Sequence, residues 1–133
     1  MLILSGENWH EGIIGIIAAR IKEKYNKPTI IISVKNKFGK ASARSIIGFD
    51  IGSIIINGVQ EGILEKGGGH KMAGGFTIHS NKIEKFKNFV IKKFEKMNID
   101  VKKQKNLYID SVISPSALNT DFYGQINNLA PFG

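Results

Sequence analysis

Five consecutive residues, Gly67-Gly68-Gly69-His70-Lys71, have the composition of a phosphate-binding segment. Because glycine has no Cβ atom, a ligand can approach the backbone N–H groups of the triplet closely. A loop of this kind can turn its N–H groups toward one point and form an anion-binding nest. His70 adds a titratable donor, and Lys71 adds a positive charge. The segment therefore predicts a phosphate-binding loop, and its structural alternative is a tight connection between a helix and a strand.

Two familiar glycine motifs do not describe this segment. A Walker loop requires Gly-Lys-Ser/Thr at a fixed spacing, and that sequence does not follow here. The dinucleotide fingerprint requires spaced glycines between a strand and a helix. Phosphate binding therefore depends on other residues that converge on the glycines.

Arg44 is one of only two arginines in the chain, and it lies in the sequence Ala-Ser-Ala-Arg-Ser. The small neighbours leave room for a ligand against the backbone, and a guanidinium donates paired hydrogen bonds to phosphate. The hydroxyls of Ser42 and Ser45 add donors of the kind that phosphate contacts use. We therefore expect a second phosphate-binding element here. The structural alternative is an ion pair of Arg44 with Asp50 or Glu61.

The three histidines lie in different local sequences. His70 follows the glycines and is the candidate phosphate donor or general acid. His10 lies at the expected start of the first helix, where the helix N-terminus favours anions. His79 is expected at the surface end of a strand. His70 and His10 are therefore the candidates for a site.

The acidic residues are not arranged for a metal centre. Metal-dependent phosphodiester hydrolysis needs several carboxylates and histidines around one or two cations. The chain has no Asp-x-Asp, no Asp-His pair and no His-x-x-x-His, and its carboxylates are scattered singly. The sequence predicts phosphate-binding parts without a metal site.

Composition sets the class of protein. The 133 residues are enough for one domain, or one domain and part of another, and 42% of them are apolar. A net charge of +8 points toward polyanions such as nucleic acid, although a coding bias toward lysine would produce the same charge. The absence of cysteine excludes disulfides and thiol chemistry. No apolar run approaches the roughly 18 residues of a membrane span, and no secretory leader is recognisable, so we expect a cytoplasmic protein without a membrane partner.

The apolar pattern predicts the elements that must position the candidate residues. Residues 29–34 form a continuous β-branched run, typical of a strand covered on both faces. An apolar strand at 1–5 and helical periodicity over 10–25 complete a strand–helix–strand unit. The fold class is therefore α/β, with a small mixed β-sheet and flanking helices. The other expected elements are strands at 40–47 and 75–78 and helices at 51–64 and 80–97.

Polar residues mark two of the helix starts. Asn8 is the expected N-cap of the first helix, with Glu11 in its first turn, and Ser80 is the expected N-cap of the third. The third helix has an apolar stripe, and most of its lysines lie off that stripe on a face typical of solvated surface. These lysines are Lys82, Lys85, Lys92, Lys93 and Lys96. Beyond it we expect a linker at 100–106, a strand at 107–113 and a helix at 116–129.

Three ordered segments resemble the RecJ family in its DHH-associated C-terminal domain. They are Asn-Trp-His-Glu-Gly-Ile-Ile-Gly-Ile at 8–16, Gly-Lys-Ala-Ser-Ala-Arg-Ser-Ile at 39–46 and Gly-Gly-His-Lys-Met-Ala-Gly-Gly-Phe at 68–76. The final Leu-Ala-Pro-Phe-Gly at 129–133 is similar to the lead into the family's OB-fold. The resemblance implies a DHH-associated substrate-binding domain over 1–100. It also implies a linker and the start of a truncated OB-fold region over 101–133.

The resemblance also implies a function. RecJ proteins degrade single-stranded DNA from the 5′ end during repair and recombination, and their DHH domain holds Mn²⁺ or Mg²⁺. Arg44 and His70 would then contact the terminal or scissile phosphate and stabilise its developing charge. Substrate-binding roles fall to Ser42, Ser45, Gly67, Gly68, Gly69, Lys71 and His10. No cofactor is expected on this segment itself.

The chain also departs from the family pattern. Gly74 stands where the family often has alanine, and neither a DHH domain before Met1 nor an OB-fold after Gly133 is present. We therefore expect an internal piece of the enzyme that is inactive alone and needs a DHH domain in cis or in trans. Two other readings stay open: a DHH phosphodiesterase of oligoribonucleotides or small nucleotides, and a non-catalytic basic module that binds nucleic acid or protein.

Overall fold

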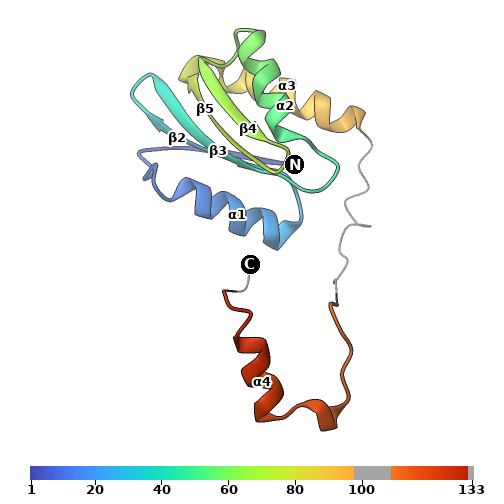
Figure 1. The fold of residues 1–133 in the computed structure, drawn as a ribbon. Helices are drawn as coiled ribbons and strands as arrows, with labels where there is room; N and C mark the ends of the chain where they lie inside the picture. The colour runs from blue at the N-terminus through green and yellow to red at the C-terminus, as the bar shows by residue number, and fades with distance from the viewer. Residues whose placement is uncertain (98–108, 132–133) are drawn as a thin grey trace.

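A computed structural model describes residues 1–97 and 109–131 of the chain, and a five-stranded sheet in the order β1-β2-β3-β5-β4 organises it (Figure 1). The elements are β1 (Leu2–Glu7), α1 (Ile14–Tyr25), β2 (Thr29–Lys35), β3 (Phe38–Arg44), α2 (Ile51–Gln60), β4 (Lys66–His70), β5 (Ala73–His79), η1 (Ser80–Lys82), α3 (Ile83–Lys96), η3 (Pro115–Ala117) and α4 (Thr120–Asn127).

The sheet is mixed, as the sequence predicts. β1 and β2 are parallel and are joined by α1, which confirms the strand–helix–strand unit. β2, β3, β5 and β4 pair antiparallel in that order. The α/β class with flanking helices is therefore confirmed.

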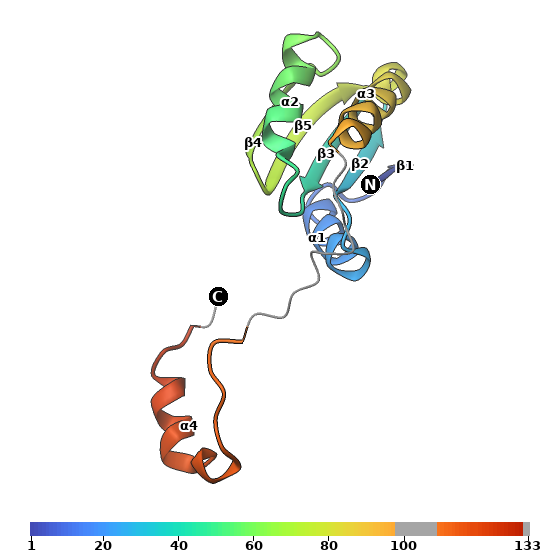
Figure 2. The same cartoon turned by 90° about the vertical axis from the view of Figure 1, so that its right-hand side faces the viewer.

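Helices cover both faces of β2, which explains its continuous apolar run. Ile30 and Ile32 point into a large core that the sheet forms with α2 and α3. Ile31 points to the opposite face, where it packs against Ile14 and Ala18 of α1. Figures 1 and 2 show α2 and α3 on one side of the sheet and α1 on the other.

The two faces are covered to different extents. The large core contains Phe49, Ile55, Phe76, Ile78, Phe86 and Val90 among its buried residues. On the opposite face, α1 packs over β2 and β3. All five residues of β4 are exposed, so the β5 and β4 part of the α1 face is left accessible.

Several element boundaries differ from the predictions. α1 begins at Ile14 rather than near residue 10, and Asn8 is not its N-cap. Asn8 instead has a φ of 56°, in the left-handed region that turns the chain after β1. α2 ends at Gln60 rather than Leu64, and Gly62 has a positive φ just beyond that end.

The third helix and the C-terminal region also need correction. Ser80 starts the short 3₁₀ turn η1, and α3 follows with no side-chain cap. Residues 109–113, expected in a strand, are irregular, and the helix expected at 116–129 is split into η3 and the shorter α4. The linker expected at 100–106 lies outside the described residues. Across the described part of the chain, we find no helix with the length and apolar character of a membrane span.

Candidate functional site

The glycine triplet forms an edge strand rather than a loop, which corrects the sequence prediction. Gly67, Gly68 and Gly69 lie within β4, which pairs antiparallel with β5. Backbone N–H groups of a paired strand point alternately toward its partner and away from it, so they do not converge on one anion. The triplet is therefore not an anion-binding nest, and its glycines need another explanation.

Close packing explains most of these glycines. A Cβ atom at Gly67 would lie 2.7 Å from Ile55 Cγ2, and one at Gly74 would lie 2.5 Å from Ile55 Cδ1. A Cβ atom at Gly69 would lie 2.4 Å from the carbonyl oxygen of Ala73. These positions need glycine because α2 and the neighbouring strand approach so closely.

Gly68 differs from its neighbours because a Cβ atom there would meet nothing within 4 Å. Since side chains alternate along a strand, Gly68 faces away from α2, toward the side of the sheet that carries α1. Protein packing does not require a glycine at this position. A ligand that approaches the backbone closely would require a glycine there.

Strand register brings the candidate residues of β3 and β4 onto that same face. Arg44 pairs with Ala73 of β5, and Ala73 pairs with His70 of β4. Neighbouring strands are about 4.8 Å apart, so only the small Ala73 lies between Arg44 and His70 in this row. The next rows along the strands are Ser42–Gly75–Gly68 and Lys40–Thr77–Lys66.

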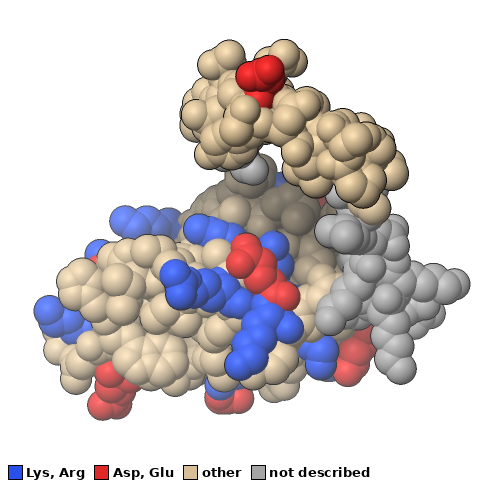
Figure 3. Space-filling view, turned by 90° about the horizontal axis from the view of Figure 1, so that it is seen from below, with Lys and Arg blue, Asp and Glu red and all other residues tan. Residues whose placement is uncertain are grey.

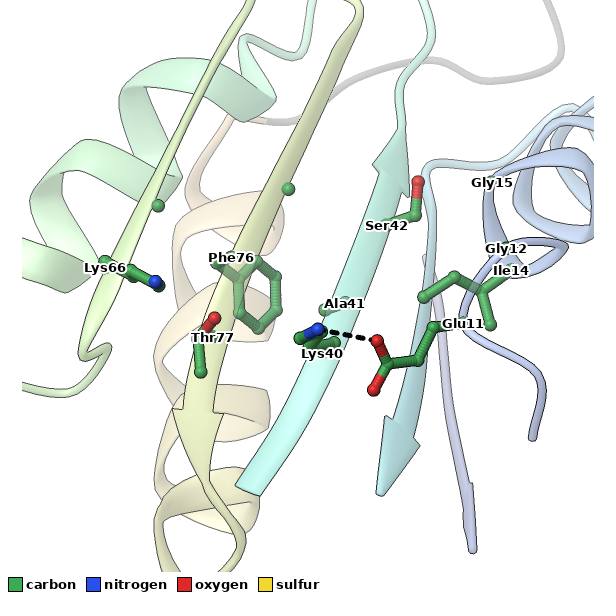
Figure 4. Close-up of a pocket in the computed structure, with 12 residues that line it drawn as sticks. Glu11, Gly12, Ile14, Gly15, Lys40, Ala41, Ser42, Lys66, Phe76 and Thr77 are labelled. Carbon is green, nitrogen blue, oxygen red and sulfur yellow. Dashed lines mark hydrogen bonds and ion pairs between the residues drawn. The ribbon is translucent and has the colours of Figure 1, made fainter. Parts of the chain in front are cut away.

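A groove of about 560 Å³ lies over the last of these rows and over Ser42 and Gly75, with the first residues of α1 on one side and β4 on the other (Figure 4). Gly68 and the Arg44–Ala73–His70 row adjoin it but are not among its lining residues. In Figure 4, Lys40 and Lys66 lie on the strands that flank β5, and Thr77 lies between them. Its lining residues are Glu11, Gly12, Ile14, Gly15, Lys40, Ala41, Ser42, Lys66, Gly67, Gly75, Phe76 and Thr77.

Arg44 is half-buried and does not line the groove, but it contacts the lining residue Ser42. Its Nη1 donates to Ser42 Oγ at 3.1 Å and to the carbonyl oxygen of Ala43 at 2.9 Å, so the side chain folds back along β3. Gly15 of α1 makes room for this arrangement, because a Cβ atom there would lie 3.3 Å from both Arg44 Nη2 and Ser42 Oγ. Arg44 belongs to none of the ion pairs found in residues 1–97 and 109–131, so its alternative role as a partner of Asp50 or Glu61 is not observed.

His70 and His10 share one local geometry. In each, the ring Nδ1 accepts a hydrogen bond from the backbone N–H two residues later, at 3.4 Å from Met72 N and at 3.1 Å from Gly12 N. With Nδ1 as acceptor, the proton of the neutral ring is on Nε2, which can donate outward. Both rings are exposed. His79 instead bonds Asn81 through Nδ1 at the end of β5, at the strand end where it is expected.

Ser45 and Lys71 lie outside the groove. Ser45 is buried, and its hydroxyl donates to the carbonyl oxygen of Phe49 in the turn between β3 and α2. Lys71 lies at the tip of the β4–β5 hairpin, beside the start of α2. The backbone N–H of Ser53 donates to the Asp50 carboxylate, and this bond, assisted by the charge of Lys71, holds the pKa of Asp50 below its ordinary value.

Four polar groove residues, Glu11, Lys40, Lys66 and Thr77, were not predicted as site residues from the sequence. Lys40 is two residues before Ser42 on the same strand face, so alternation along the strand could have identified it. Lys66 and Thr77 join it only through the β4–β5 register. Lys40 forms an exposed ion pair with Glu11, with 2.7 Å between Nζ and Oε2.

The groove carries two lysines and one carboxylate, Glu11, and is not a metal centre. Within the part of the chain that the structure describes, no three His, Asp or Glu side chains come together as metal ligands. Figure 3 shows the molecule from the α1 side, where basic side chains gather with acidic ones among them. The helix α3, whose sequence contains Lys85, Lys92 and Lys93, lies on the other side of the sheet from α1.

Comparisons with known sequences are consistent with one another. Residues 1–96 match the DHHA1 domain family. The single-stranded-DNA-specific exonucleases RecJ of Dickeya dadantii and Escherichia coli are 33% and 35% identical to this chain over 82 and 81 residues, which is 59% of this chain and 14% of each relative. RecJ of Bacillus subtilis is 24% identical over 134 residues, or 99% of this chain and 17% of the relative. The chain therefore spans less than a fifth of the length of these relatives.

Solved structures extend the likeness to nearly the whole chain. RecJ of Thermus thermophilus in complex with Mn²⁺ superposes with a TM-score of 0.78 at 25% identity, over 99% of this chain and 19% of that one. The C-Ala domain of alanyl-tRNA synthetase from Aquifex aeolicus shares the fold, with a TM-score of 0.58 at 12% identity over 72% of this chain and 88% of that one. The chain belongs to the DHHA1 domain family and is a DHHA1 segment of the RecJ type.

Proposed function

We propose that this chain is the DNA-gripping part of a RecJ-type exonuclease and that the groove on the α1 face binds the sugar–phosphate backbone of single-stranded DNA. The observation that carries the proposal is the bare strand surface at the edge of the groove, where Gly68 lies in one row with the lining residues Gly75 and Ser42. Gly68 is a glycine at a position where no protein atom requires one. The neighbouring rows supply the cations and hydroxyls that phosphate contacts use.

The side chains in the groove and in the row beside it have complementary roles toward a phosphodiester. Arg44 bonds Ser42 and the backbone through Nη1, which leaves Nη2 to donate to a phosphate oxygen. His70, separated from Arg44 across the sheet by Ala73 alone, has its Nε2 available to donate a hydrogen bond to the phosphate. Lys40 and Lys66 add charge along the floor. Donors on both sides of Ala73 would stabilise negative charge that develops on a phosphate held between them.

Hydrolysis itself would depend on a second domain. The T. thermophilus relatives hold Mn²⁺ or Mg²⁺, whereas residues 1–97 and 109–131 of this chain assemble no ligand set that fits such ions. We therefore assign the metal to a DHH domain supplied in cis or in trans. The residues of this chain bind and orient the strand, and this chain alone is expected to cut nothing.

A binding titration tests the proposal. The chain is titrated with 5′-phosphorylated single-stranded DNA and followed by fluorescence anisotropy, for the wild type, Arg44→Ala and His70→Ala. A charge-assisted hydrogen bond contributes about 1.5–3 kcal/mol, so loss of the Arg44 contact should weaken binding by about tenfold to a hundredfold. The His70 variant should lose less, because a neutral imidazole makes a weaker bond.

The matched control removes charge from the opposite side of the sheet. Replacing Lys85, Lys92 and Lys93 together by alanine should lower affinity modestly and change the slope of affinity against salt concentration by about a few units at most. If binding follows these lysines and ignores Arg44 and His70, the chain is a general basic module and the groove is not the site. Addition of Mn²⁺ completes the test, because cleavage by the isolated chain would contradict the assignment of the metal to another domain.

A further inference from the structure

Trp9 lies beside the groove, in the segment between β1 and α1, and belongs to neither hydrophobic core cluster of the described chain. Its side chain is 40% exposed. We propose that Trp9 is a stacking platform for an unpaired base next to the phosphates in the groove. This inference rests on the proposed function, since it assigns a second subsite for the same single-stranded nucleic acid.

Gly6 of β1 supports the indole ring from below. A Cβ atom at Gly6 would lie 2.2, 2.4 and 2.6 Å from three adjoining ring atoms, Cε2, Cζ2 and Nε1. Because these three distances are nearly equal, one face of the ring lies flat over Gly6. Any side chain at position 6 would displace the ring. The sheet thus covers one ring face, and the 40% exposure of the side chain leaves the ring accessible to a ligand from elsewhere.

The backbone around Trp9 is tied to β2. The hydroxyl of Ser33, a residue only 2% exposed, donates to the carbonyl oxygen of Trp9. The N–H of Asn8 donates to the carbonyl oxygen of Val34 at 2.9 Å, and Asn8 has a left-handed φ of 56°. An aromatic ring held in this way has little freedom to lose when a ligand binds, which favours affinity.

The platform adjoins the phosphate groove directly. A second hollow of about 640 Å³ is lined by Asn8, Trp9, His10, Glu11, Ser33, Lys35 and Lys40, and it shares Glu11 and Lys40 with the groove. Gly6, Ser33 and Lys40 form one row across β1, β2 and β3, so Gly6 and Lys40 are about 10 Å apart. That separation is comparable to the length of one nucleotide. A base on Trp9 would therefore place its phosphate near Lys40 and the Nε2 of His10.

Stacking on Trp9 would also select the state of the nucleic acid. A base inside a duplex has both faces covered by its neighbours and cannot lie on the ring, whereas the bases of a single strand can be splayed out onto it. Stacking on an aromatic side chain accepts any base, because every base has a π-face. The subsite would thus favour single strands with little dependence on sequence.

Trp9 is the only tryptophan of the chain, so its fluorescence reports on the subsite alone. The probes are an oligothymidylate and an abasic oligomer of the same length, which has phosphates but no bases. We expect the oligothymidylate to quench Trp9. We also expect Trp9→Ala to weaken its binding by about 5- to 100-fold, with a smaller loss for Trp9→Phe. The abasic oligomer should bind the wild type and Trp9→Ala equally.

Two further variants separate stacking from structural damage. Gly6→Ala keeps the tryptophan but displaces its ring, so it should lose affinity for oligothymidylate as Trp9→Ala does. Tyr25→Ala removes another exposed aromatic ring, at the far end of α1, and should have no effect.

Two results would overturn the inference alone: equal affinity of wild type and Trp9→Ala for oligothymidylate, or an equal loss by Trp9→Ala on both oligomers. If the wild type bound neither oligomer, the proposed function would fail together with the inference.

Discussion

Gly68→Ala is the sharpest test of the groove, because it changes the ligand side of the sheet alone. The new methyl group would meet no protein atom within 4 Å, and Gly68 has no positive φ that alanine would strain. Gly→Ala at a compatible site stabilises a protein by about 0.4–1 kcal/mol through the unfolded chain. The melting temperature of Gly68→Ala should therefore stay level or rise slightly.

The same methyl group should weaken DNA binding. A carbon–carbon bond is about 1.5 Å long, so the methyl would lift a phosphate from about 4 Å to about 5.5 Å from a cation such as Arg44. At an effective dielectric constant of about 20, this change costs about 1 kcal/mol for one cation and about 2 kcal/mol for two. Affinity should fall by about 5- to 30-fold. The assay is anisotropy with 5′-phosphorylated single-stranded DNA, alongside thermal melting.

Gly67→Ala is the matched control one residue away. Its methyl group would lie 2.7 Å from Ile55 Cγ2 and 2.7 Å from Phe76 Cβ, within the packed side of the sheet. Overpacking of this kind costs about 1–3 kcal/mol, so this variant should melt earlier. Wild-type affinity in Gly68→Ala would refute the placement of DNA over the bare strand surface at the edge of the groove. If Gly68→Ala instead lowered the melting temperature as much as Gly67→Ala does, the assignment of Gly68 to the open face of the sheet would be wrong.

Three other changes test neighbouring features. Gly15→Ala should weaken DNA binding severalfold, because the new methyl group would lie 3.3 Å from Arg44 Nη2 and disturb that side chain. Its stability should stay nearly unchanged, because alanine favours the helix more than glycine does. Anisotropy measures the first effect and thermal melting the second. The pKa of Asp50 is lowered in the folded state, so its contribution to stability is present above the unfolded pKa of 3.8 and is lost as the pH falls through the lower folded value. Asp50→Asn, which keeps an N-cap, should flatten that part of a stability profile between pH 2 and pH 5, and an unchanged profile would contradict the cap assignment. Phe86→Ala, at a fully buried core position, should cost about 3–5 kcal/mol in a denaturant titration, and a much smaller loss would mean that α3 does not pack as described.

Local patterns were enough to predict the framework but not the shape of the site. The β-branched run at 29–34 predicts a strand covered on both faces, because only a doubly covered strand buries successive Ile side chains. The row that places His70 beside Arg44 depends on the β3–β5–β4 register, which pairs residues far apart in the sequence. The family resemblance identified both segments without that register.

The glycine triplet was misread for a physical reason. Glycine is depleted in strands, so three in a row favour a loop when the sequence is read alone. The preference is overridden here because Ile55 of α2 packs where Cβ atoms of Gly67 and Gly74 would lie. The start of α1 was predicted too early for a related reason. The left-handed turn at Asn8 and the hydrogen bond from Ser33 to the carbonyl oxygen of Trp9 hold residues 8 and 9 outside the helix, and neither can be recognised from the local sequence.

The position of β4 at the rim of the sheet bears on self-association. Within the described chain β4 pairs only with β5, so the outer row of its backbone groups is unpaired and resembles a template on which another strand could add. The Lys-Gly-Gly-Gly-His sequence makes it a poor template, because glycines offer an incoming strand no side chains to pack against and Lys66 adds repulsion. The same bare backbone that we propose lies against DNA therefore also disfavours aggregation through the exposed edge of the sheet.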